Sequence, residues 1–201
     1  MKKSRFFATY VRMFSTLLCP VLLGSIFVSS SALAQTAQVS LSESSAQMKY
    51  SLLVGGQSFG RSEFGIGYLY NSDDNYILES GLHVIDEAGS AIPGLKVAVG
   101  GKVYGAVIPS RQILALGLGG GLRYAIPNNE RLAISVEGYY SPEIVTYLDA
   151  TNFWELALRV EYEILQQASG FVEGRQFETK LNNGVSGSID EGVRLGIRLE
   201  F

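Results

Sequence analysis

Cysteine, histidine, proline and charge are all scarce in this chain of 201 residues, which holds one Cys, one His and five Pro. A single cysteine excludes a disulfide framework within the chain. Charged residues make up only 17% of the chain, and 11% are aromatic, a composition that excludes a disordered polymer. A net charge of −3 and a pI near 5.3 argue against a nucleic-acid-binding protein.

An export signal is the clearest feature of the N-terminal region. Four basic residues and no acidic residue lie within positions 1–12, and a mostly apolar stretch follows over positions 14–28. Ala32 and Ala34 then form an A-x-A end. The apolar stretch is shorter than the roughly 20 residues that a membrane-spanning helix needs. We therefore predict a bacterial secretory signal over residues 1–34 that is cleaved after Ala34.

Alternation of apolar and polar residues dominates the remaining region, residues 35–201. This region contains no apolar run of 18 residues, so the sequence predicts no membrane-spanning helix there. Alternation places successive side chains on opposite faces of a strand. It predicts ten strands, at 37–43, 47–55, 61–71, 75–84, 95–105, 112–124, 131–140, 152–164, 169–178 and 191–201.

The length of these segments favours a transmembrane antiparallel up-and-down β-barrel of about ten strands over residues 35–201, with eight strands as the alternative. Several segments reach the 9–11 residues that a tilted strand needs to cross a bilayer. The connections are expected to be long on the outer side and short on the periplasmic side, with 84–94 as an exception. The long set is 106–111, 141–151 and 179–190, and the short set is 125–130 and 165–168.

Aromatic residues on the apolar faces gather near the predicted strand ends, where the rims of a barrel would meet the two membrane interfaces. Tyrosine and tryptophan prefer these interfaces because their rings are partly apolar and partly polar. We therefore predict two aromatic girdles. They comprise Tyr70, Tyr76, Tyr140 and Trp154 toward one rim and Tyr124, Tyr162 and Phe201 toward the other.

The polar faces carry nearly equal numbers of cations and anions, and in a barrel these faces line the lumen. Because an unpaired buried charge costs several kcal/mol, we expect a lumen filled by ion pairs. The predicted network is Lys49, Glu63, Glu79, Lys96, Lys102, Arg123, Arg131, Glu137, Glu155, Arg159, Glu161, Glu163, Glu173, Arg175, Arg194, Arg198 and Glu200. Acidic residues outside it, such as Asp149 and Asp190, are assigned to loops.

Motifs that could bind a ligand or catalyse a reaction lack the neighbouring residues or secondary structure that such a site requires. The glycine-rich run at 117–121 lies inside an alternating strand with no following helix, so it is not a phosphate loop. His83, the only histidine, shares an inward face with Glu79, and Ser80 points to the opposite face. The stretch 71–75 reads as a turn. We predict no catalytic residue, cofactor or metal site, and no enzymatic activity.

Several strings of the sequence are similar to a known family. They are VGGK at 99–102, GGGLRY at 119–124, EGYYSPE at 137–143, the alternating stretch 153–162 and a last strand that ends at Phe201. Together they resemble the YfaZ family of small outer-membrane proteins of Gram-negative bacteria. The resemblance covers most of residues 47–201 and implies an outer-membrane barrel, with no catalytic residues to carry over.

The expected function is that of an integral outer-membrane barrel with a structural role and a largely plugged, ion-paired lumen. A narrow pore for small polar solutes and a soluble periplasmic β-sandwich that binds a ligand are the alternatives. The expected partners are outer-membrane lipid and the barrel-assembly machinery. The last strand, which ends at Phe201, resembles the signal that this machinery recognises. The sequence leaves the oligomeric state open.

Overall fold

The computed structural model describes residues 34–54, 60–89, 92–109, 111–182 and 186–201, and in these ranges the chain is almost entirely β-structure. The predicted signal segment therefore lies outside the described residues, apart from Ala34. The elements are β1 (Gln35–Ser42), β2 (Ser45–Leu53), β3 (Arg61–Asn71), β4 (Asn75–Glu87), β5 (Leu95–Ile108), β6 (Arg111–Ile126), β7 (Asn129–Ser141), η2 (Glu143–Val145), β8 (Thr146–Leu148), β9 (Ala150–Leu165), β10 (Ala168–Leu181) and β11 (Ser186–Glu200).

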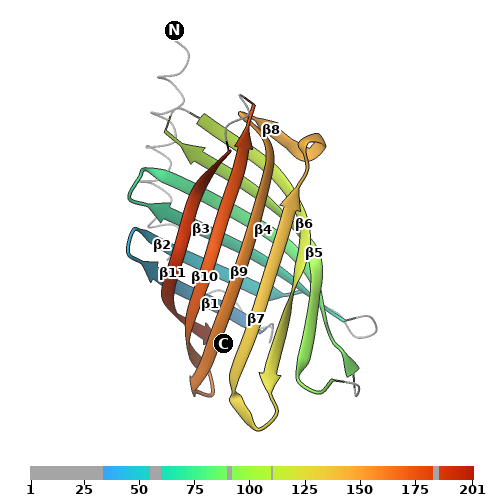
Figure 1. Ribbon diagram of the computed structural model, residues 1–201. Coiled ribbons are helices and arrows are strands. Elements are labelled where there is room, and N and C mark those ends of the chain that lie inside the picture. The colour runs from blue at the N-terminus through green and yellow to red at the C-terminus, as the bar shows by residue number, and fades with distance from the viewer. Residues whose placement is uncertain (1–33, 55–59, 90–91, 110, 183–185) are drawn as a thin grey trace. The chain divides into compact units, whose positions relative to one another are not determined.

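Ten long antiparallel strands close into a barrel (Figure 1). Each long strand pairs with the next long strand in the chain, including β5 with β6 and β7 with β9, and β11 pairs with β1 to close the sheet. The short β8 continues the position of β7 beside β6, where residues 113–115 pair with it. The predicted up-and-down barrel of ten strands is confirmed, and the eight-strand alternative is wrong.

The side chains follow an inverted pattern, with apolar residues outside and charged residues inside. On β9, Leu156 and Leu158 are 47% and 57% exposed, whereas Glu155, on the opposite face of the same strand, is 1% exposed. On β11, Leu195 is 64% exposed and Arg194 is 2% exposed. A soluble sandwich would bury its leucines and expose its charges, so this pattern identifies the outer surface as a lipid-facing one.

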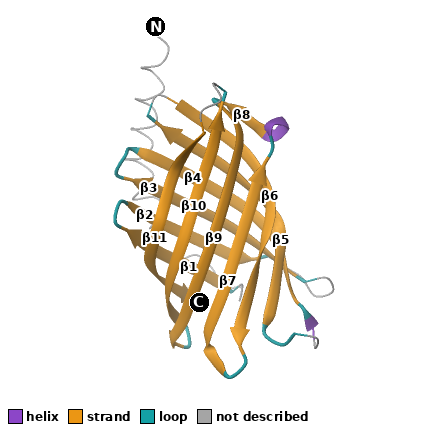
Figure 2. Cartoon of the chain, viewed as in Figure 1, coloured by secondary structure: helices purple, strands orange, loops and turns teal. Residues whose placement is uncertain are grey.

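The two rims of the barrel are easy to identify. At the terminal rim, Gln35 and Phe201 exchange backbone hydrogen bonds of 3.2 and 2.9 Å. The β6–β7 and β9–β10 turns lie at the same end as the C-terminus in Figure 1. The far rim carries the β3–β4, β5–β6 and β10–β11 turns together with η2, which Figure 2 shows next to β8. No helix among the described residues is long and apolar enough to cross a membrane.

The expected contrast between long and short connections is correct for the short turns at 125–130 and 165–168 and for the long connection at 141–151, which holds η2 and β8. It is wrong for the other two connections expected to be long. Most of 179–190 and 106–111 is strand, because β10 runs to Leu181, β11 starts at Ser186, and β5 and β6 nearly meet. Polar residues such as Lys180 extend the hairpin, pairing with Ser186 across the ladder. Short turns therefore occur at both rims, and 54–60 and 88–94 at the terminal rim are longer than most far-rim turns.

Asp190 is also misplaced by the loop prediction, since it lies in β11 and is 3% exposed. The β10–β11 register shifts here: Phe177 pairs with Asp190, and Glu178 pairs with Ser188. Ile189 is the extra residue of this bulge, and it faces the lumen together with Asp190. A bulge interrupts the period of two, which is why alternation alone stops short of this segment.

Candidate functional site

The lumen is filled in layers, and the layer next to the far rim is apolar. Tyr104, Phe153 and Phe177 have no exposed surface and pack ring against ring, with centroids 4.6 Å apart for Tyr104–Phe153 and 5.8 Å apart for Phe153–Phe177. We call these three residues the aromatic layer. Inward aliphatic side chains surround it, namely Leu69, Ile77, Ile113 and Ile189.

Glu155 lies directly beneath the aromatic layer and is held from three sides. Its Oε2 accepts hydrogen bonds from the Tyr104 hydroxyl at 2.5 Å and from the Lys102 ammonium at 3.1 Å. The Arg175 guanidinium is 3.5 Å from its Oε1. Glu155, Tyr104 and Arg175 are buried, and Lys102 is 6% exposed where it lines the cavity described below. Removal of one partner would therefore leave a poorly compensated charge in the lumen.

A second centre forms around Glu173 on β10. Arg159 donates to Glu173 Oε2 at 2.8 Å through Nε and at 2.5 Å through Nη2, and Arg175 lies 3.0 Å from Oε1. The Arg159 guanidinium also stacks 4.0 Å from the ring of Phe171. Arg159 and Glu173 are direct neighbours in the β9–β10 register, so the two arginines on this carboxylate tie the neighbouring strands β9 and β10 together on their inward face.

Gln47 links the two centres to β11. Its Oε1 accepts from Arg175 Nη1 and from Arg194 Nη1, each at 3.0 Å, and its Nε2 donates to Glu79 at 3.4 Å. Arg194 in turn pairs with Asp190. We call this connected set, from Glu79 to Asp190, the ionic layer. A glutamine with both its acceptor and its donor in use connects charges that would otherwise repel.

A cavity of about 870 Å³ occupies the half of the lumen that opens at the terminal rim. Its inner end is formed by Lys49, Glu79 and Lys102, which are linked by ion pairs of 2.9 and 3.9 Å. Among the described residues that line it, none belongs to the aromatic layer. The cavity therefore ends at the ionic layer, and the aromatic layer lies beyond it.

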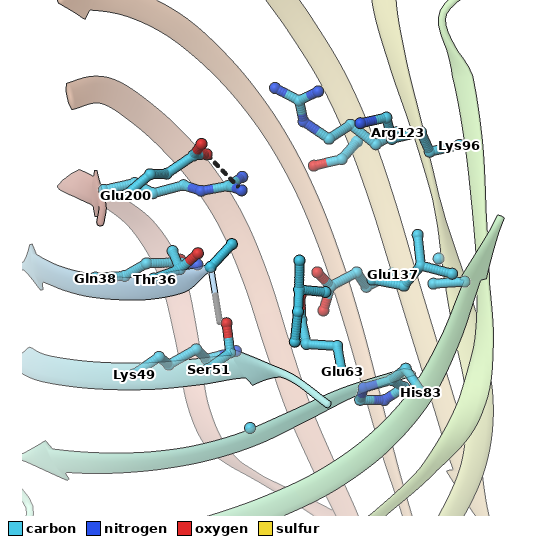
Figure 3. Close-up of a pocket in the computed structure, with 18 of the residues that line it drawn as sticks. Thr36, Gln38, Lys49, Ser51, Glu63, His83, Lys96, Arg123, Glu137 and Glu200 are labelled. Atoms are coloured by element: carbon cyan, nitrogen blue, oxygen red, sulfur yellow. Dashed lines mark ion pairs between the residues drawn. The ribbon is translucent and has the colours of Figure 1, made fainter. Parts of the chain in front are cut away.

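His83 faces this cavity from β4 and is bonded to one hydroxyl. Figure 3 shows His83 at the cavity wall. Its Nε2 lies 2.9 Å from the Tyr139 hydroxyl, and the Lys102 ammonium lies 4.0 Å from the centre of the Tyr139 ring. Neither a serine nor an acid orients this imidazole in the described part of the chain. The arrangement gives a rigid polar wall and no nucleophile next to a base.

The seventeen charged residues assigned to the lumen all lie on inward faces. Thirteen of them line the cavity, and Glu155, Glu173, Arg175 and Arg194 are buried deeper. Near the terminal rim, Arg123 and Arg198 share Glu161 at 3.0 and 3.4 Å. Among the described residues, the one ion pair of Lys96 is with the exposed Glu87, at 3.9 Å. Arg131, Glu63 and Glu163 have no ion pair within 4.0 Å among the described residues.

The aromatic residues assigned to girdles occur at the two rims. Tyr70 pairs with Tyr76, and Tyr140 pairs with Trp154, near the far rim. Near the terminal rim, Phe201 is 67% exposed, and the other two residues of that group, Tyr124 and Tyr162, are also on the outer face.

Three kinds of lumen residue were not predicted from the sequence. The aromatic layer, Gln47 and Asp190 were not among the predicted network residues, although the parity of β10 places Phe177 on the face of Glu173 and Arg175. Their partners come from across the lumen, and alternation along one strand contains no information about cross-lumen contacts. Within the described ranges, no group of three or more His, Cys, Asp or Glu could hold a metal ion.

A closed barrel of ten antiparallel strands, apolar outside and charged inside, is an integral outer-membrane barrel. The profile of the YfaZ precursor family matches residues 21–201, and the chain belongs to this family. The protein is therefore an exported protein of the outer membrane, as the resemblance in sequence implied. The soluble β-sandwich alternative is not favoured.

The chain is similar to several solved structures, among them a channel, a porin and an autotransporter domain. The outer membrane channel DcaP of Acinetobacter baumannii is 10% identical, with a TM-score of 0.43, over 87% of this chain and 60% of the DcaP chain. The KdgM porin in complex with disordered oligogalacturonate is 12% identical, with a TM-score of 0.42, over 84% of this chain and 99% of that chain. The translocator domain of autotransporter NalP from Neisseria meningitidis is 12% identical, with a TM-score of 0.35, over 98% of both chains. No curated protein matches the sequence.

Proposed function

We propose that this protein is a non-conducting outer-membrane barrel with a structural, non-enzymatic role, whose lumen is closed by its own side chains. The observation that carries the proposal is the stacking of two closed layers. The aromatic layer has no exposed surface, and Glu155 beneath it is bonded to Tyr104, Lys102 and Arg175 at once. We expect these groups to deny water and ions a continuous polar path through the lumen.

The size of the barrel supports the same proposal. Barrels of about eight strands are just wide enough for side chains to fill, and water-filled porins use about 16–18 strands. This barrel has ten strands and uses long Arg, Lys and Glu side chains to fill its centre. The narrow pore is the second candidate, because the cavity of about 870 Å³ already opens one half of the lumen to water.

The terminal rim is assigned to the periplasm in this proposal. The exposed Phe201 directly follows the last strand, and it is the expected contact for the barrel-assembly machinery on the periplasmic side. The cavity then opens to the periplasm, and the aromatic layer lies toward the cell exterior. Outer-membrane lipid covers the apolar outer surface between the two rims.

Swelling of proteoliposomes in a small neutral sugar tests the closed lumen. Purified wild-type barrel is expected to swell no faster than protein-free liposomes, with a wide porin as the positive control. Phe177→Ala removes one ring of the aromatic layer and is expected to raise permeability above that of Phe64→Ala, which changes an exposed, lipid-facing ring. Rapid swelling of the wild type would overturn the proposal in favour of the narrow pore.

A further inference from the structure

The walls of the terminal cavity carry opposite charges in separate places. Lys96 on β5 and Arg123 on β6 stand directly opposite each other in the register, and Arg131 follows on β7. Figure 3 shows Lys96 and Arg123 side by side at one side of the cavity. Like charges on neighbouring strands destabilise a sheet unless an anion compensates them. This cationic wall therefore has a specific requirement for negative charge.

The acids available in the protein meet this requirement only in part. Arg123 shares Glu161 with Arg198, and the contact of Lys96 with Glu87 joins side chains that are 45% and 72% exposed. An exposed pair of this kind contributes little binding energy. Arg131 therefore has no ion pair within 4.0 Å in the described part of the chain, and Lys96 has only an exposed one that an external anion can replace.

Glu63 on β3 provides the opposite feature. Its carboxylate lines the same cavity, half-buried, and forms no ion pair within 4.0 Å in the described part of the chain. It lies opposite His83 on β4, and His83 lies opposite Gly100 on β5. Glu63 is therefore level with Gly100 on β5, which lies four residues from Lys96 on the same strand. A half-buried carboxylate of this kind is a ready partner for an ammonium group.

The separation of the two sites defines the size of a ligand. Two strand spacings of about 4.8 Å and four residues of about 3.3 Å place the Cα atoms of Glu63 and Lys96 roughly 16 Å apart along the wall. Side chains that point into the cavity shorten this gap toward the roughly 10 Å length of an extended tripeptide. Neutral side chains on β1 and β2, such as Gln38, Thr36 and Ser51, face the cavity from the other side (Figure 3). They offer hydrogen bonds to peptide groups.

We propose that the terminal cavity is a binding site for short zwitterionic peptides, with the peptide carboxylate at Lys96 and Arg131 and the peptide ammonium at Glu63. A zwitterion brings an anion to Lys96 and Arg131 and a cation to Glu63, which has no ion pair within 4.0 Å among the described residues, without adding net charge to the cavity. This peptide site rests on the proposed function in one respect: a closed lumen gives the cavity a single entrance, at the terminal rim.

Calorimetric titration of the purified full-length barrel with three matched peptides tests the site. Triglycine carries both charges, acetyl-triglycine lacks the ammonium, and triglycine amide lacks the carboxylate. Loss of one charged hydrogen bond weakens binding about tenfold, so each capped peptide is expected to bind at least that much more weakly than triglycine. Equal affinity for all three, or no heat with triglycine, would overturn the proposal.

Variants assign each end of the peptide. Glu63→Gln is expected to weaken triglycine about tenfold and to leave acetyl-triglycine unchanged, because that peptide has no ammonium to lose. Lys96→Gln and Arg131→Gln are expected to weaken triglycine and to leave triglycine amide unchanged. Lys180→Gln, at an exposed position near the far rim, is the matched control. Heat-modifiable migration on gels verifies that each variant is folded.

The outcome is separable from that of the proposed function. Peptide binding by a barrel that conducts would overturn the closed lumen and leave the site intact. A closed barrel that binds none of the peptides would overturn the site alone. Variants that weaken all three peptides equally would show that the side chains act on the fold rather than on the peptide ends, and would also overturn the assignment.

Discussion

The guanidinium of Arg194 contacts the carboxylate of Asp190, four residues earlier on the same strand. In a regular strand, residues at this spacing lie about 13 Å apart. Gly192, between them, has a φ of +141°, and the bulge at Ile189 bends the strand just before it. Glycine adopts this backbone conformation readily, whereas residues with a Cβ atom rarely do. An irregular strand thereby brings a buried cation and a buried anion together.

We expect Arg194→Ala to be strongly destabilising. The change leaves Asp190 and part of Glu173 without their cation, and an uncompensated buried charge costs about 3–5 kcal/mol. Lys180→Ala, an exposed residue of β10, is expected to change stability by less than about 0.5 kcal/mol. Urea unfolding of the refolded barrel, followed by heat-modifiable migration, measures both. Equal stability of the two variants would contradict the ionic layer.

Replacement of Arg194 and Asp190 together is expected to cost less than Arg194→Ala alone. Arg194→Met combined with Asp190→Leu removes both charges and fills the space with apolar atoms, and such exchanges are often close to neutral. The neighbouring aliphatic side chain of Ile189 provides a suitable environment. The same unfolding assay gives the coupling free energy as a double-mutant cycle. A purely additive double variant would show that the two side chains do not interact.

Leu156→Arg and Ala157→Ser distinguish the two faces of β9 at adjacent positions. Leu156 is 47% exposed on the lipid-facing side, where an arginine costs about 2–4 kcal/mol near the middle of the bilayer. Ala157 is 3% exposed and faces the lumen, where a small hydroxyl finds polar partners. Ala157→Ser is therefore expected to be nearly neutral. Folding yield into lipid vesicles compares them, and a similar loss for both would mean that the faces are wrongly assigned.

Labelling of single cysteines tests the orientation of the barrel. The only natural cysteine, Cys19, lies in the predicted signal, so introduced thiols report alone. A membrane-impermeant maleimide is expected to label Ser72→Cys, in the β3–β4 turn at the far rim, on intact cells. Gln167→Cys, in the β9–β10 turn at the terminal rim, is expected to react only after the outer membrane is permeabilised. The reverse pattern would invert the assignment.

Cleavage after Ala34 predicts a mature protein that starts at Gln35. β1 starts at the same residue, and Gln35 closes the terminal rim by bonding to Phe201. A long extension before Gln35 would have to leave the barrel next to this contact. Mass spectrometry of the assembled protein measures the N-terminus directly, and an intact segment 1–34 would refute the cleavage.

The fold followed from one simple property of the sequence, the period of two. Alternation placed all ten barrel strands, because lipid outside and charge inside impose opposite demands on successive residues. It failed at Asp190, where a bulge adds Ile189 and shifts the parity of everything before it. It also underestimated strand ends such as Lys180, because polar residues pair in the ladder as well as apolar ones do.

The composition of the lumen was harder to predict than its position. Charge balance along the inward faces indicated an ion-paired interior, and pairs such as Lys49–Glu79 at 2.9 Å are of that kind. The contact of Phe153 with Phe177, however, depends on the width of the closed barrel and on the stagger of the strands. These quantities arise from the whole sheet, and no single segment of the sequence specifies them.

Single-channel recording in planar bilayers tests the closed lumen most directly. The purified wild-type barrel is reconstituted at low density, and the current is measured under an applied voltage in concentrated salt. Because the aromatic layer is fully buried and Glu155 is bonded on three sides, we predict no steady openings above the bare bilayer. Steady, water-filled openings of the correctly folded wild type would contradict the account and identify the protein as a pore.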